Sequence, residues 1–139
     1  MDLISYAKTM IGTSYRWGGN GGEAFDCSGF VQEVLACEGL DKKGDQTAQE
    51  IYNHFLQKGL GSGIQRRSLL FFGESTEKIT HVAIAIGSSQ MIEAGGGGRN
   101  IKTHEDAIKA GAMVRIRPIT SRLDLIAAVK IPEREYYNE

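Results

Sequence analysis

The chain has 139 residues, of which 41% are hydrophobic and 24% are charged, as is typical of one globular domain. Its net charge is −1. The chain therefore lacks the excess of basic residues that would indicate a nucleic-acid partner or attraction to anionic membranes. Apolar stretches such as 82–86 are too short to span a bilayer. We therefore expect a single domain over residues 1–139, monomeric, with no nucleic-acid partner and no membrane insertion.

The first residues, 1–6, lack the positive and long apolar regions of a signal peptide. The sequence is therefore either made in the cytosol or cut from a longer secreted chain. If its two cysteines, Cys27 and Cys37, share a helix, their Cα atoms are about 15 Å apart, too far for a disulfide. No CxxC pair or histidine-rich spacing suggests zinc, and we expect neither a metal nor an organic cofactor.

Apolar residues recur with helical spacing in three segments of the first half, which are residues 2–11, 27–39 and 47–59. Asp26 occupies the N-cap position of the second segment. Thr47 and Glu50 form a capping box that opens the third. In this third helix the apolar residues are expected to face the core, namely Ala48, Ile51, Phe55 and Leu56. Residues 13–25, between the first two helices, are predicted to be a loop.

The second half is instead rich in β-branched residues in short runs. The strand-like segments are residues 69–72, 81–86, 90–94, 113–119 and 125–131. Helices followed by a mostly antiparallel sheet indicate an α+β fold. The polar tail, residues 133–139, is expected to be loose.

Cys27 lies in the sequence Asp-Cys-Ser-Gly-Phe, at the first turn of the second predicted helix. Unsatisfied backbone N–H groups and the positive end of the helix dipole favour a thiolate at that place. Since the thiolate is the reactive form, Cys27 is a candidate nucleophile. The alternative is a buried structural cysteine, the commoner fate of a lone cysteine. That alternative is the prediction for Cys37, which has no flanking glycine and no histidine motif nearby.

A cysteine nucleophile needs a base, and three histidines are available. His54 falls off the apolar stripe of its helix and is expected to face solvent, whereas His104 lies in a polar stretch as a loop or helix start. His81 heads a strand-like segment, and the alternate residues on its own face are Ala83 and Ala85. These small side chains leave room for a closely packed helix, so His81 is the candidate base.

The next strand brings a third group to the same face. If residues 87–89 form a three-residue hairpin loop, Ile84 pairs with Ile92 and Glu93 falls diagonal to His81. Glu93 could then accept a hydrogen bond from one ring nitrogen and orient the imidazole. A two-residue loop would instead send Glu93 to the opposite face, as a solvated carboxylate.

Six segments, in this order and spacing, resemble the NlpC-type family of bacterial cell-wall peptidases, which have a papain-like fold. They are residues 3–12, 15–19 (Tyr-Arg-Trp-Gly-Gly), 26–30, 69–73, 81–87 and 91–94. The resemblance implies that Cys27 is the nucleophile and His81 the base. The third polar position falls at Glu93, where family members often carry His, Asn or Gln. The hydroxyl of Tyr15 and the backbone N–H of Cys27 would stabilise the oxyanion.

The resemblance also implies a substrate cleft. Asp26 and Ser28 match positions that hold a free amino terminus in some relatives, although Asp26 would serve equally as a helix cap. Trp17, Arg99 and the loop 95–98 could border the same cleft. One departure is the sequence Gln-Arg-Arg-Ser before Leu69, where the family usually has a Pro-Gly-Asp turn. The turn must therefore be built differently.

The implied reaction is amide hydrolysis through a thioester, on a peptidoglycan stem peptide, between D-glutamate and a diamino acid. The protein is then expected to act on the bacterial cell wall, as a phage-type endolysin or an excised secreted domain. Three alternatives stay open: an amidase of the same fold that cuts the sugar–peptide amide, a wall-degrading effector toxin, and a catalytically silent wall-binding module.

Overall fold

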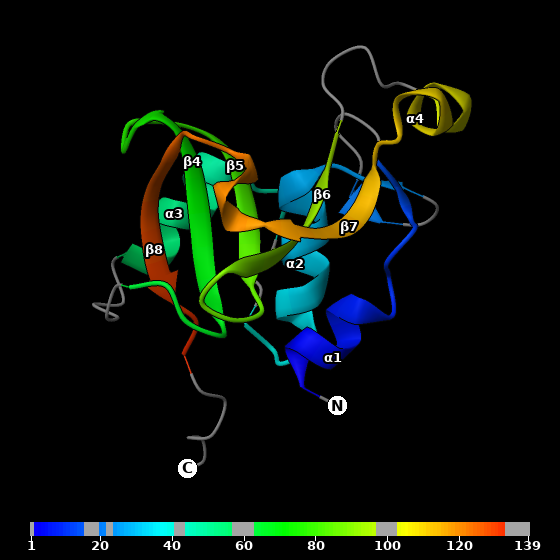
Figure 1. Cartoon of the computed structure of the whole chain (residues 1–139). Coiled ribbons are helices and arrows are strands. Elements are labelled where there is room, and N and C mark those ends of the chain that lie inside the picture. The colour runs from blue at the N-terminus through cyan, green and yellow to red at the C-terminus, as the bar shows by residue number, and fades with distance from the viewer. Residues whose placement is uncertain are drawn as a thin grey trace.

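The computed structural model describes residues 2–15, 20–21, 24–40, 44–56, 63–96 and 103–132. It has the expected α+β architecture, in which N-terminal helices pack on a mostly antiparallel sheet (Figure 1). The helices are α1 (Leu3–Lys8), α2 (Cys27–Ala36), α3 (Ala48–Leu56) and α4 (His104–Ala110), with a 3₁₀ turn, η1 (Ile119–Ser121). No helix in these ranges is long and apolar enough to cross a membrane.

Local capping decides where the helices begin. The Asp26 carboxylate accepts a hydrogen bond from the backbone N–H of Gly29 (2.7 Å) and starts α2. Thr47 and Glu50 exchange side-chain and backbone hydrogen bonds (2.9 and 3.1 Å) ahead of α3, as the capping box predicts. The prediction for Leu56 was wrong: it is 51% exposed, because it ends the helix beyond the buried stripe.

The sheet has the order β2-β3-β1-β7-β6-β5-β4-β8. Its strands are β1 (Ser14–Tyr15), β2 (Asn20–Gly21), β3 (Ala24–Phe25), β4 (Ser68–Ser75), β5 (Lys78–Ala85), β6 (Gln90–Gly95), β7 (Met113–Pro118) and β8 (Leu125–Lys130). Every strand pair is antiparallel except β1 with β3. Three strands fall in the segment predicted to be a loop, because strands of two residues are too short for an alternating pattern.

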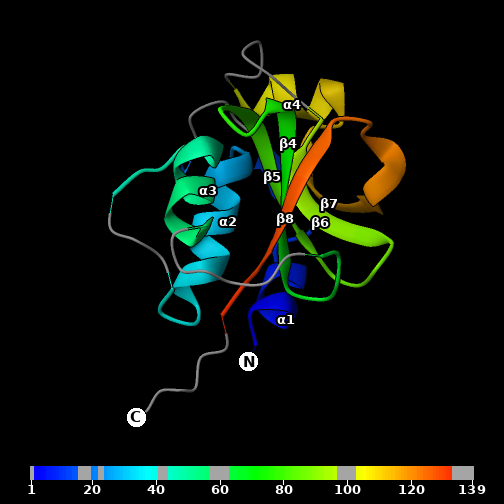
Figure 2. The ribbon, with the colours of Figure 1, turned by 90° about the vertical axis from the view of Figure 1, so that its left-hand side faces the viewer.

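The sheet separates two clusters of buried side chains. Figure 2 shows α2 and α3 along one face, where Phe30, Val34, Val82 and Ile84 belong to the main core. Ala83 lies on the opposite face in a smaller cluster, with the side chains Leu70, Phe72, Ala85, Met91 and Ile119. The prediction that a helix packs against the two alanines was therefore wrong. Larger side chains of β4, β6 and η1 fill that space instead.

The turn before β4 is built on an arginine, as the unusual sequence there requires. Arg67 has a φ of 79°, a left-handed conformation that is uncommon for a non-glycine residue. Both its terminal nitrogens donate to the Glu38 carboxylate (3.0 Å each), and one also donates to the Pro132 carbonyl (2.8 Å). Glu38 accepts in addition from the backbone N–H of Leu3 (3.0 Å). This buried pair ties the ends of α2 and β8 to the start of α1.

Candidate active site

Cys27 is the first residue of α2, so its side chain lies at the positive end of the helix. The side chain is partly exposed, and its sulfur lies 4.0 Å from the carbonyl oxygen of Thr80 on β5. That contact places the thiol beside the strand that carries His81. Cys37, the other cysteine, caps the opposite end of α2 and is also a free thiol.

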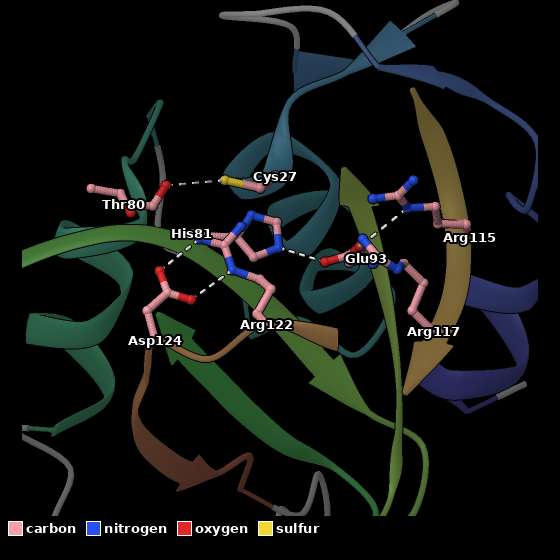
Figure 3. Close-up of polar contacts among 8 residues, drawn as sticks. All are labelled: Cys27, Thr80, His81, Glu93, Arg115, Arg117, Arg122 and Asp124. Carbon is pink, nitrogen blue, oxygen red and sulfur yellow. Dashed lines mark hydrogen bonds and ion pairs between the residues drawn. The ribbon is translucent and has the colours of Figure 1, made fainter. Parts of the chain in front are cut away.

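His81 lies between Cys27 and Glu93 (Figure 3). Its Nε2 is 2.7 Å from Glu93 Oε1, and the two side chains are 8% and 1% exposed. The predicted register produces this contact, since Ile84 pairs with Ile92. Because Nε2 is engaged by the carboxylate, Nδ1 is the nitrogen left for the thiol.

The surroundings of His81 favour its protonated form. Burial opposes protonation, but hydrogen bonds with Cys27 and Glu93 and the negative charges of both groups outweigh it, and the pKa of His81 rises to about 9. Burial raises the pKa of Glu93, yet the hydrogen bond to His81 and the nearby cations more than offset this and hold that pKa below its usual value. At neutral pH the site therefore contains an imidazolium–carboxylate pair.

Two arginines that the sequence reasoning missed complete the surroundings of Glu93. Arg115 Nε donates to Glu93 Oε2 at 3.1 Å, and an Arg117 nitrogen lies 3.6 Å from the same oxygen. Both residues project from β7, in which Arg115 pairs directly with Glu93. The sequence does show two arginines at alternate positions of a predicted strand. Placing them beside Glu93 would have required knowing that β7 pairs with β6.

These groups line one cleft of about 370 Å³. Tyr15 also lines it and is 5% exposed. Burial, together with the charges of Cys27 and Asp26, raises the pKa of Tyr15. Its hydroxyl therefore stays protonated and can donate a hydrogen bond to a developing oxyanion. A further arginine of the cleft, Arg122, lies over the Phe72 ring and pairs with Asp124 through two contacts (2.8 and 3.0 Å).

Six predicted site residues thus come together in this cleft, namely Tyr15, Asp26, Cys27, Ser28, His81 and Glu93. The other two, Trp17 and Arg99, lie outside the described residues, as do positions 97–98 of the glycine loop. His104 does not line the cleft. It begins α4, and its Nδ1 lies 2.8 Å from the hydroxyl of Ser14. Within the described ranges, no group of three or more His, Cys, Asp or Glu side chains could hold a metal ion.

Comparison with known proteins identifies a family for the chain. The NlpC/P60 family model matches residues 12–118. A probable endopeptidase p60 of Listeria innocua is 37% identical over 92 residues, covering 66% of this chain and 19% of the relative. A gamma-D-glutamyl-L-lysine dipeptidyl-peptidase of Bacillus subtilis is 29% identical, covering 73% and 34%. The chain thus spans about a fifth to a third of the length of these relatives.

Solved structures of whole domains match more completely. The NlpC/p60 domain of the peptidoglycan hydrolase SagA has a TM-score of 0.64 and 28% identity, with 93% of this chain and 96% of that chain covered. RipD of Mycobacterium tuberculosis, described as a non-catalytic NlpC/p60 domain protein adapted to peptidoglycan binding, has a TM-score of 0.67 and 20% identity, with 94% and 95% covered. The fold alone therefore does not distinguish a hydrolase from a binding module.

Proposed function

Because the chain belongs to the NlpC/P60 family, we propose that it is a cysteine endopeptidase that hydrolyses peptidoglycan stem peptides. One observation carries the proposal: a helix-start cysteine faces a buried histidine whose far nitrogen bonds a carboxylate, all within an open cleft. This is the arrangement of nucleophile, base and orienting group that covalent amide hydrolysis needs.

The first half of the reaction forms a thioester. The Cys27 thiolate, paired with the His81 imidazolium, attacks the substrate carbonyl carbon. The Tyr15 hydroxyl and the backbone N–H of Cys27 donate to the oxyanion. Protonated His81 then gives its proton to the leaving amine as the carbon–nitrogen bond breaks.

The second half regenerates the thiolate–imidazolium pair. His81, now neutral, accepts a proton from water while the water oxygen bonds the thioester carbonyl carbon. The carbon–sulfur bond breaks, and the sulfur leaves as the thiolate. Glu93 keeps the imidazole oriented throughout, since its hydrogen bond engages Nε2 and leaves Nδ1 for the chemistry.

The names of the relatives support the assignment of a peptidoglycan stem peptide as the substrate. Endopeptidases and a gamma-D-glutamyl-L-lysine peptidase are among them, so we assign the scissile bond to D-glutamate and a diamino acid. Asp26 and Ser28 line the cleft beside Cys27, and their oxygens suit a free amino terminus on the stem peptide. On this proposal the protein acts on the bacterial cell wall, as a phage-type lysin or a domain of a secreted enzyme.

The test is digestion of purified peptidoglycan by three proteins: the wild type, Cys27→Ala and the matched control Cys37→Ala. Mass spectrometry of the released fragments is expected to show new amino termini on the diamino acid with the wild type and the control, and none with Cys27→Ala. Loss of activity in Cys37→Ala as well would indicate a structural effect and not loss of the nucleophile.

Other outcomes of the digestion would favour one of the alternative functions. Fragments split at the sugar–peptide amide would keep the cysteine mechanism and make the protein an amidase. Binding to walls of several chemotypes without any release would make it a silent module of the RipD kind. A wall-degrading effector toxin would show the same cleavage, with a gene for an immunity protein nearby in place of one for a holin.

A further inference from the structure

The Glu93 carboxylate is held from two sides, and only one side belongs to the nucleophile–base pair. Oε1 bonds His81, whereas Oε2 accepts from Arg115 and lies near Arg117. The carboxylate side chain is 1% exposed, and those of the arginines are 26% and 35% exposed. Glu93 therefore does not act on the imidazole as an uncompensated negative charge, because two cations share it.

The end of β6 is shaped around this contact. A Cβ at Gly95 would lie 2.8 Å from Glu93 Oε2 and 3.4 Å from an Arg115 nitrogen. A Cβ at Gly96, which has a φ of +90°, would lie 2.8 Å from the other terminal nitrogen of Arg115. A side chain at either position would therefore require the Glu93 carboxylate or the Arg115 guanidinium to shift.

His81 is surrounded by charged groups from several elements. β4 contributes only the neutral Phe72 ring, 5.5 Å away between centroids. Within the part of the chain that the structure describes, the charged and titratable groups come from β1, α2 and its N-cap, β6, β7 and the segment before β8. They are Tyr15, Asp26, Cys27, Glu93, Arg115, Arg117, Arg122 and Asp124. Arg122 already neutralises Asp124. Once Cys27 is a neutral thioester, Glu93 is the principal anion in contact with the imidazole.

We propose that Arg115, supported by Arg117, is a positioning residue that offsets the charge of Glu93, so that His81 can act as a neutral base when water attacks the Cys27 thioester. The inference rests on the proposed function. The inference explains how a carboxylate can occupy a position at which an orienting group need carry no charge. An uncompensated carboxylate would raise the proton affinity of His81, so that after its proton has left with the amine the imidazole would take up another from solvent. The water could then not be deprotonated, and the thioester would persist.

The kinetic test uses Arg115→Met and a soluble stem peptide. Slow thioester hydrolysis lowers kcat and KM together, by about tenfold, and leaves kcat/KM within about twofold, because the imidazolium that acylation needs is already present at neutral pH in both proteins. Acid-quenched samples are expected to show the acyl-enzyme by intact mass. Arg115→Lys retains the charge and is expected to restore most of kcat, whereas Lys8→Met, the same charge change on the exposed face of α1, alters neither constant.

A second measurement needs no turnover. In the Cys27→Ala protein, which stands for the state without a thiolate, the NMR titration of His81 is followed with and without Arg115→Met. We expect the proton affinity of His81 to rise at least about tenfold on loss of the arginine. Adding Glu93→Gln is expected to abolish most of this rise, since the arginine acts through the carboxylate.

These outcomes separate the two proposals. An unchanged or lower proton affinity in Arg115→Met would overturn the inference, whatever the enzyme does to peptidoglycan. A fall in kcat/KM with no acyl-enzyme would overturn it as well, by assigning Arg115 to substrate binding. If Cys27→Ala and the wild type release the same fragments, the proposed function fails and the role in thioester hydrolysis fails with it, while the titration still measures the charge coupling.

Discussion

Glu93→Gln tests whether the carboxylate sets the proton affinity of His81. Opposite charges about 4 Å apart, at an effective dielectric constant of about 20, attract by about 4 kcal/mol. Since about 1.4 kcal/mol corresponds to one pKa unit, removing the charge is expected to lower the pKa of His81 from about 9 to about 6. The neutral amide keeps the size of the side chain and can still orient the ring.

The assay is an NMR pH titration of the labelled imidazole rings, with His54 and His104 as internal references in the same samples. At neutral pH the variant is expected to hold less imidazolium, and therefore to react more slowly with iodoacetamide at Cys27. A fall in the pKa of His81 smaller than about one unit would refute the reasoning. It would mean that the thiolate, and not Glu93, stabilises the imidazolium.

Three further predictions follow from particular contacts. Arg67→Met removes the cation that pairs with the buried Glu38 carboxylate, so urea denaturation should show the free energy of unfolding reduced by about 3 kcal/mol; a loss below about 1 kcal/mol would mean that the pair behaves like a surface one. Asp26→Asn keeps the helix cap but removes the charge, so KM for a stem peptide should rise about tenfold with little change in Tm, and acetylating the peptide's amino terminus should remove the difference. Gly95→Ala crowds the Glu93 carboxylate and should lower kcat about tenfold or more; Gly87→Ala, where nothing lies within 4 Å of the added Cβ, is its control, and equal activities would contradict the packing argument.

Local patterns in the sequence were enough to predict the elements that carry the proposed nucleophile and base. A cap at Asp26 starts α2, and a three-residue loop sets the register that brings Glu93 to His81. Both features depend on neighbours close in sequence, so they can be worked out without knowing the fold. The resemblance to the family added the role of Tyr15, which the structure places in the same cleft.

Features that depend on distant pairing were missed or incomplete. The arginines around Glu93 come from β7, whose position beside β6 is set by the whole sheet. The helix α4 was anticipated only as a possible start at His104, although Thr103 and Asp106 form a capping box ahead of it. The face of Ala83 was predicted correctly but its packing partner was not, because small side chains leave space without determining which element fills it.

The proposed nucleophile comes early in the chain, and the groups proposed to activate it come much later. Cys27 precedes His81 by 54 residues and Arg115 by 88, and β4 lies between β5 and β8, the last strand of the described residues. Pairings between segments so far apart in sequence form late in folding. On the ribosome the cysteine therefore emerges without an imidazole to activate it. A chain that ended before β5 would carry the Cys27 thiol without His81 or Glu93.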